Sequence, residues 1–168
     1  MLLLVSTGLA ACEAVRSRGQ LEAKWGGHDS GHVSAPARGV WCPGSNLLKL
    51  TGVKDDAGVG IAVYPVDSLT SGDYPVTDPA GDSTTRPRSA LAIRWFTDQE
   101  IQGYQGDSGV VSIDRRGSTV FGRIDASMFR AATYDTLHLT GTFRAVRMNE
   151  DSAACAVDSS NADTMDSE

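Results

Sequence analysis

The sequence has 168 residues, a formal net charge of −6 and three cysteines. With 40% hydrophobic and 21% charged residues, it can bury the core of one globular domain, which excludes wholesale disorder. Four acidic residues near the C-terminus carry −4 of the charge, so neither half has the basic excess of a nucleic-acid-binding chain. Eighteen glycines, sixteen aspartates and three lysines disfavour helices, and we expect an all-β protein.

The first twelve residues resemble a bacterial lipoprotein signal. Residues 1–11 are uncharged and contain a short apolar run, and small residues precede Cys12. In such signals the cysteine thiol becomes linked to diacylglycerol after the peptide before it is removed, so we expect Cys12 to be the lipidated N-terminus. Signals of this kind open with Lys or Arg. None precedes Cys12, so we expect the natural chain to begin upstream of Met1.

This resemblance also implies a location. Eleven residues are too few to cross a bilayer, which takes about 20, so attachment would depend on the acyl chains, palmitate among them. In the sorting rule of such lipoproteins an aspartate after the cysteine signals retention in the inner membrane. Glu13 occupies that position, which favours the outer membrane, facing the periplasm. The alternative is a buried apolar segment with Cys12 as an ordinary core thiol.

Residues 12–24 show no sustained periodicity, and we expect a tether. Residues 25–155 are expected to form the domain, and residues 156–168, which lack aromatic side chains, a disordered acidic tail. Apolar residues alternate along five clear strands, near residues 59–64, 91–95, 111–113, 120–126 and 137–145. Weaker strands are expected near residues 25–27, 33–41, 47–51 and 74–76.

Turn-forming residues separate these strands, at 54–58, 71–73, 78–82, 106–109 and 115–118. The strands follow one another too closely for helical crossovers, so they should be antiparallel. The expected fold is a single antiparallel β-sandwich, or flattened barrel, of about eight or nine strands.

The two remaining cysteines suit a disulfide. If Cys12 carries lipid, Cys42 and Cys155 form an even pair in an oxidising compartment. A bridge closing a loop of about 100 residues contributes about 4–5 kcal/mol in the chain-entropy model. The alternative is two buried or free thiols.

Four short motifs occur in a familiar order, at residues 72–76, 107–113, 120–126 and 139–143. Together they resemble uncharacterised bacterial lipoproteins that carry a small β-sandwich domain of unknown function. The resemblance covers about residues 45–148. It implies a fold and an envelope location, and it transfers no catalytic residue.

One segment suggests nucleophilic chemistry. Gly106-Asp107-Ser108-Gly109 matches the residues around the nucleophile of chymotrypsin-like proteases, and His28 and His32 precede it. Val110 departs from that pattern, and neither histidine has the surroundings that the family requires. We therefore interpret the segment as a turn that leads into a strand.

Other polar residues have simpler interpretations. His28 and His32 could bind a metal on a helix, but the glycines around them predict an exposed hairpin. His138 alternates with leucines, so it should lie on a solvated strand face. Asp55, Asp56, Asp78 and Asp82 do not follow the spacing of a calcium loop.

Basic and aromatic residues leave two alternatives open. Five arginines could form an anion-binding stripe or cross-strand ion pairs: Arg94, Arg115, Arg123, Arg144 and Arg147. Trp25, Trp41 and Trp95 are expected to pack in the core rather than to form a ligand platform. The sequence thus predicts a lipid-anchored, non-catalytic binding or structural module that needs no metal or cofactor and binds no nucleic acid, with a small envelope hydrolase or metal-dependent enzyme as the alternative.

Overall fold

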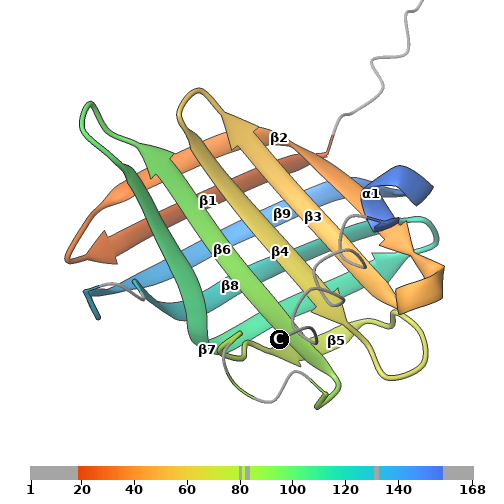
Figure 1. Ribbon diagram of the computed structural model, residues 1–168. Helices are drawn as coiled ribbons and strands as arrows, with labels where there is room; N and C mark the ends of the chain where they lie inside the picture. The colour runs from red at the N-terminus through yellow and green to blue at the C-terminus, as the bar shows by residue number, and fades with distance from the viewer. Residues whose placement is uncertain (1–18, 80, 82–83, 131–132, 157–168) are drawn as a thin grey trace, which may run out of the picture.

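The computed structural model describes residues 19–156 apart from 80, 82–83 and 131–132. Within these residues, nine strands and a short helix after the last strand make up the fold, and 3-10 turn η1 (Pro43–Ser45) links β2 to β3 (Figure 1). The elements are β1 (Gln20–Gly27), β2 (Gly31–Cys42), β3 (Leu47–Lys54), β4 (Ala57–Tyr64), β5 (Gly72–Pro75), β6 (Arg88–Phe96), β7 (Ile101–Arg116), β8 (Thr119–Phe129), β9 (Thr136–Glu150) and α1 (Ser152–Ala156). The chain is therefore all-β, as its composition predicts.

Eight of the strands close into a barrel. Each of β1, β2, β3, β4, β6, β7, β8 and β9 pairs with the next along the chain, and β9 returns to pair with β1. The pairing of consecutive strands is antiparallel, while the ends of β2 and β9 also meet in parallel over three residue pairs. The short β5 lies outside the ring and pairs with β7. The sheet thus closes on itself rather than forming the two stacked layers of a sandwich.

The interior of the barrel is filled by side chains. Alternate residues of every barrel strand point inward, as the period of two requires, and form one apolar cluster. Its largest fully buried members include Tyr104, Phe143 and Met128. An eight-stranded barrel is just wide enough for side chains to fill it. Concave surfaces able to meet a ligand are therefore to be sought on the outer wall.

One end of the barrel, which we call the aromatic end, is closed by stacked rings. Trp95 lies between Trp25 and Tyr104, with ring centroids 5.2 Å and 5.5 Å apart. The Tyr104 hydroxyl donates a hydrogen bond of 2.6 Å to Asp29 in the β1–β2 loop. Burial, this hydrogen bond and the charges of Asp29 and Asp135 raise the pKa of Tyr104 well above its ordinary value.

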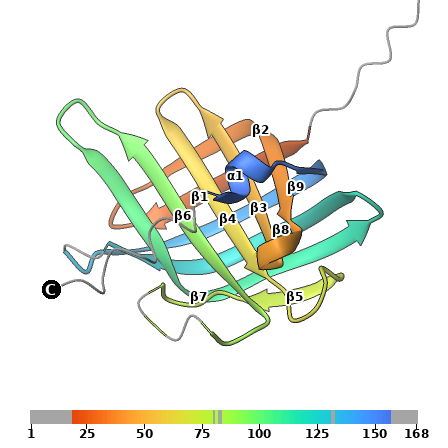
Figure 2. The same cartoon turned by 45° about the vertical axis from the view of Figure 1, so that its right-hand side comes forward.

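The opposite end, which we call the disulfide end, is closed by the long connection from β4 to β6, and the helix α1 packs on the outer wall beside it. Leu69 and Tyr74 of that connection are buried in the core. Arg86 donates hydrogen bonds of 3.1 Å and 3.0 Å to the carbonyl oxygens of Asn46 and Pro65, which fastens the end of the connection to the β2–β3 loop and to its own beginning. Figure 2 shows α1 outside the barrel wall, over β2 and β3.

Two boundaries differ from those that the sequence suggests. β1 begins at Gln20, inside the expected tether, because Leu21 and Ala23 alternate with Glu22 and Lys24 and belong to the sheet. The helix α1 extends the described fold to Ala156. Residues 1–18 and 157–168, which contain the expected signal, Cys12 and the acidic tail, lie outside the described residues.

The structure of residues 106–109 also differs from the turn that the sequence suggests. This segment lies inside the continuous strand β7, at a bulge where the register with β8 shifts between Gly106 and Ser108. Gly109 has a φ of +122°, and a Cβ at this position would lie 2.3 Å from the Asp125 carbonyl oxygen. The glycine therefore serves a bend in the strand rather than the turn that its neighbours suggest.

Candidate functional site

A polar groove with a volume of about 760 Å³ lies on the outer wall of β8, β9, β1 and β2. Its lining combines exposed polar side chains with a floor of backbone and small or apolar residues: Glu22, Ala23, Lys24, His32, Val33, Ser34, Val110, Arg123, Ile124, Asp125, Thr140, Gly141, Thr142 and Arg144. Gly141 is needed in the floor, because a Cβ there would lie 2.6 Å from the Glu22 carbonyl oxygen. We call this surface the polar groove.

The strand register arranges the polar side chains in two rows across four strands. In one row Glu22 lies between Ser34 and Thr142, and Thr142 pairs with Arg123. The second row is shifted by two residues along each strand and consists of His32, Lys24, Thr140 and Asp125. Acidic and basic groups therefore alternate along β1 and along β8.

Most of these groups are free to meet a ligand. Arg123 donates a hydrogen bond of 3.3 Å to the hydroxyl of Ser112. Within the described ranges, the side chains of Glu22, Lys24 and Arg144 form no hydrogen bond or ion pair. A surface of hydroxyls and both charges can pair with a polar ligand that carries both signs of charge.

A histidine and a carboxylate lie beside the groove. His138 and Asp125 form a cross-strand pair, with Nε2 and Oδ1 3.1 Å apart, and Ser127 is the register partner of His138. The His138 and Asp125 side chains are 56% and 64% exposed, so water screens this pair. In the part of the chain that is described, no hydrogen bond joins Ser127 to His138, so the three residues do not form a relay.

Ser108 has no such partner either. Its hydroxyl donates a hydrogen bond of 3.2 Å to the neighbouring Asp107, and both residues are exposed. Among the described residues, no histidine contacts Ser108 by a hydrogen bond. Nucleophilic attack needs a base within hydrogen-bonding distance of the serine, and this geometry does not supply one.

The other histidines lie apart. His28 is in the β1–β2 loop with its Nδ1 3.7 Å from Asp135, while His32 lies on β2 in the polar groove. This segment forms a hairpin, as its glycines predict. Over the described residues, no group of three or more His, Cys, Asp or Glu side chains is placed to hold a metal ion. Asp82 lies outside those residues.

The five arginines do not form one stripe. Arg123 and Arg144 line the polar groove, whereas Arg94 lies on β6 in a different hollow. Arg115 donates hydrogen bonds to the carbonyl oxygens of Leu69 and Gly117 and so helps to fix a loop. Trp25 packs in the core as expected, whereas Trp95 and Trp41 are half-buried against it.

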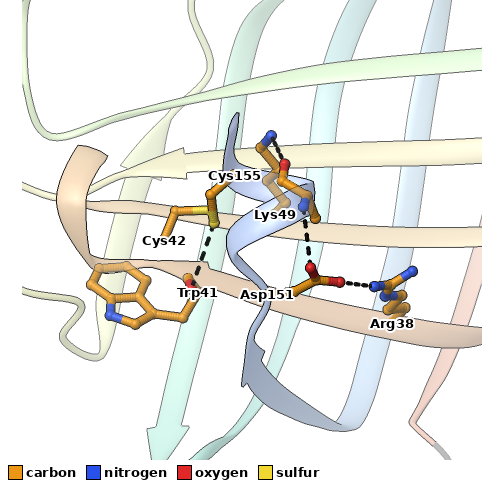
Figure 3. The surroundings of a disulfide bond; sticks show 7 residues. Arg38, Trp41, Cys42, Lys49, Asp151 and Cys155 are labelled. Carbon is orange, nitrogen blue, oxygen red and sulfur yellow. Dashed lines mark hydrogen bonds and ion pairs between the residues drawn. A yellow bond between two sulfur atoms is a disulfide. The ribbon is translucent and has the colours of Figure 1, made fainter. Parts of the chain in front are cut away.

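The predicted cysteine pair is present at the disulfide end (Figure 3). Cys42 at the end of β2 and Cys155 in α1 have their sulfur atoms 1.96 Å apart and their Cα atoms 5.6 Å apart. Asp151 accepts hydrogen bonds from the Ala154 backbone N–H, at 3.2 Å, and from Arg38, at 2.5 Å. Lys49 donates to the Ala154 carbonyl oxygen at 2.9 Å, so contacts from Arg38 and Lys49 hold the helix to the barrel wall together with the disulfide.

The β1 part of the polar groove, from Glu22 to Lys24, was not predicted, because residues 12–24 were expected to form a tether. The alternation of Glu22 and Lys24 with Leu21 and Ala23 was the signal that could have found it.

Comparison with protein-family models, with curated proteins and with solved structures finds no match. Within the described residues, no helix has the length and apolarity needed to span a membrane.

Proposed function

We propose that this chain is an exported, lipid-anchored protein of the bacterial cell envelope that acts as a non-catalytic binding module. The observation that carries the proposal is the Cys42–Cys155 disulfide. Structural disulfides persist in oxidising compartments and are rare in the cytosol. The third cysteine, Cys12, follows the short apolar run and small residues of a lipoprotein signal.

The nature of the outer wall supports binding rather than catalysis. The barrel interior is filled, and the polar groove presents hydroxyls and both charges without a serine held by a base. We infer that the groove contacts a polar envelope component that carries both acidic and basic groups. Ligand binding at such a surface rests on many exposed contacts of modest strength.

The anchor is tested by metabolic labelling of the full chain with an alkyne-bearing fatty acid. The wild type should incorporate the label and sediment with membranes, and Cys12→Ser should lose both properties. Cys155→Ser is the matched control, because acylation at Cys12 does not need the disulfide. Label retained in Cys12→Ser, or no label in the wild type, would contradict the anchor.

The groove is tested by photo-crosslinking in intact cells. A benzophenone amino acid replaces Thr140 in the groove or, as the control on the same strand, Asn149 outside it. The proposal predicts adducts from position 140 that are absent from position 149, and that decrease when Arg123→Glu is added. No adduct at position 140, or equal adducts at both positions, would show that the groove is not the contact surface.

A further inference from the structure

A second hollow, which we call the apolar groove, lies on the outer wall of β3, β4 and β6. Its volume is about 330 Å³, and it shares no lining residue with the polar groove. It is lined by Thr51, Val53, Asp55, Asp56, Ala57, Gly58, Val59, Gly60, Ala92, Arg94 and Phe96. The groove runs toward the aromatic end, where the β3–β4 turn and the β6–β7 turn lie.

The floor of this groove departs from the usual pattern of a solvated strand. Outward positions of an antiparallel strand facing water are normally polar, yet here they are Gly58, Gly60 and Ala92. A Cβ at Gly60 would have the Ala92 carbonyl oxygen, at 4.0 Å, as its nearest neighbour. The fold therefore leaves room for a larger side chain at this position, and glycine keeps the groove open.

Large apolar side chains border the floor on both sides. Val53 on β3 is 67% exposed and Phe96 on β6 is 57% exposed. The register places Val53 opposite Gly58, and Gly58 opposite Arg94, so the two borders face each other across β4. Exposed apolar side chains around a hollow are typical of contact surfaces.

The two borders also carry opposite charges. Asp55 and Asp56 lie at the β3 border, and Arg94 lies at the β6 border. Among the described residues, these three side chains form no hydrogen bond or ion pair. A partner of one charge sign would leave one border unmatched.

We propose that the apolar groove is the interface of a symmetric homodimer. A two-fold axis that lies in the interface and runs along β4 brings the β3 border of one copy against the β6 border of the other. Val53 and the two aspartates then face Phe96 and Arg94 of the second copy, and the reverse contacts form as well. The patch is thus complementary to itself in both charge and apolarity.

The glycines have a role in this arrangement. Gly58 and Gly60 lie on β4, along the axis, where neither position places a side chain between the two copies. Backbones approach each other most closely where side chains are absent. This inference does not depend on the lipid anchor, since it uses only the outer wall of the described barrel.

The test is sedimentation equilibrium of the oxidised full chain carrying Cys12→Ser, which cannot be acylated at that position. The proposal predicts a species of about twice the 17.7 kDa mass of one chain, in equilibrium with the monomer. Gly60→Lys should remove the dimer, because it fills the groove and places two positive charges near the axis. Ser127→Lys, on the exposed outer face of β8, adds the same charge away from the groove and should leave association unchanged.

Charge reversal tests the arrangement independently of folding defects. Arg94→Glu and Asp56→Arg should each weaken association at least about tenfold, and the double variant should recover most of it. A folded wild type that stays monomeric up to about 100 µM overturns the homodimer and leaves another protein as the occupant. A dimer that survives Gly60→Lys and both reversals also overturns it, because the contact then lies elsewhere.

Discussion

The two ends of the barrel differ in what closes them. At the disulfide end, hydrogen bonds from Arg86 to backbone carbonyl oxygens hold the connection that closes the barrel. The disulfide and a hydrogen bond from Lys49 hold the helix on the outer wall beside it. At the aromatic end closure depends on the Trp25–Trp95–Tyr104 stack and on one hydrogen bond to Asp29. The disulfide forms only where thiols are oxidised, whereas the ring stack does not depend on redox conditions.

This difference shows that the two ends of one barrel can be closed by different kinds of interaction. Eight strands of alternating residues build the barrel. The aromatic end is closed by Trp25, Trp95 and Tyr104 of the strands themselves, whereas the disulfide end is closed by residues of the connection between β4 and β6. Because the closures rely on different interactions, they can be weakened separately.

The largest effect is expected from removing the disulfide. Cys42 and Cys155 are separated by 113 residues, and replacing both by alanine should lower the free energy of unfolding by about 4 kcal/mol, since the unfolded chain regains the entropy of that loop. Urea denaturation measures the loss. Cys12→Ala in the otherwise wild-type chain serves as the control and should leave the free energy of unfolding unchanged. A loss below about 1 kcal/mol would show that the disulfide end is held mainly by its other contacts.

At the aromatic end, Trp95→Ala should cost about 3 kcal/mol, because it removes the middle ring of the stack and leaves a cavity. Trp95→Phe keeps an aromatic ring and should cost less than about 1.5 kcal/mol. Thermal unfolding of both variants in oxidised and reduced protein sharpens the comparison. Equal losses in both redox states would show that the ends act independently, whereas a loss that depends on the redox state would contradict this.

Tyr104→Phe should have a smaller effect, about 1–2 kcal/mol, since it removes the hydrogen bond to Asp29 and retains the ring. Asp29→Asn, which keeps a hydrogen-bond acceptor, is the matched control and should cost less. Hydrogen exchange of the β1–β2 loop reports the change locally. A Tyr104→Phe variant as stable as the wild type would mean that the ring stack alone closes this end.

The same tyrosine gives the aromatic end a pH dependence. Its pKa is raised in the folded chain, so the native state holds the phenol proton more tightly than the unfolded state does. This contribution is fully present below the ordinary tyrosine pKa of about 10 and is lost as pH rises above it toward the folded value. Stability should therefore fall above about pH 10 in the wild type and fall less in Tyr104→Phe. Parallel pH profiles for the two proteins would contradict this cause.

The smallest effect is expected on the outer wall, which belongs to neither closure. Lys24→Ala and Thr140→Ala in the polar groove should change the free energy of unfolding by no more than about 0.5 kcal/mol, because both side chains are exposed. Chemical denaturation measures this. A larger loss from either variant would assign the groove a structural role.

Much of the barrel wall was predictable because it follows a local rule. Val59, Ile61 and Val63 alternate with small residues, and the strand they predict, β4, is present with this inward face. The composition likewise predicts an all-β chain. The cysteine count predicts the pairing of Cys42 with Cys155, because only two thiols remain once Cys12 is set aside.

Closure of the sheet was not predictable in the same way. Whether a meander forms a sandwich or a barrel depends on the pairing of β1 with β9, which joins Leu21 to Phe143 across the whole chain. The alternation of apolar and polar residues within each strand does not show which other strand it will pair with. The bulge at Ser108 was also hidden, because glycines and an aspartate inside a strand look like a turn.

The polar groove is a third feature that the sequence alone could not predict. Its rows of side chains come from four strands, and Lys24 and Thr140 become neighbours only when β1 and β9 pair. Each residue alone is an ordinary solvated strand position. Sites assembled across strands in this way require the register, which the sequence did not supply.

The central claim is that the chain is exported, lipidated at Cys12 and bridged between Cys42 and Cys155. Peptide-level mass spectrometry of the protein extracted from membranes without reductant tests it most directly. The account predicts an N-terminal peptide that begins at Cys12 and carries diacylglycerol on its sulfur, together with one linked peptide pair containing Cys42 and Cys155. Recovery of residues 1–11 still joined to an alkylatable Cys12, with Cys42 and Cys155 equally alkylatable, would contradict it.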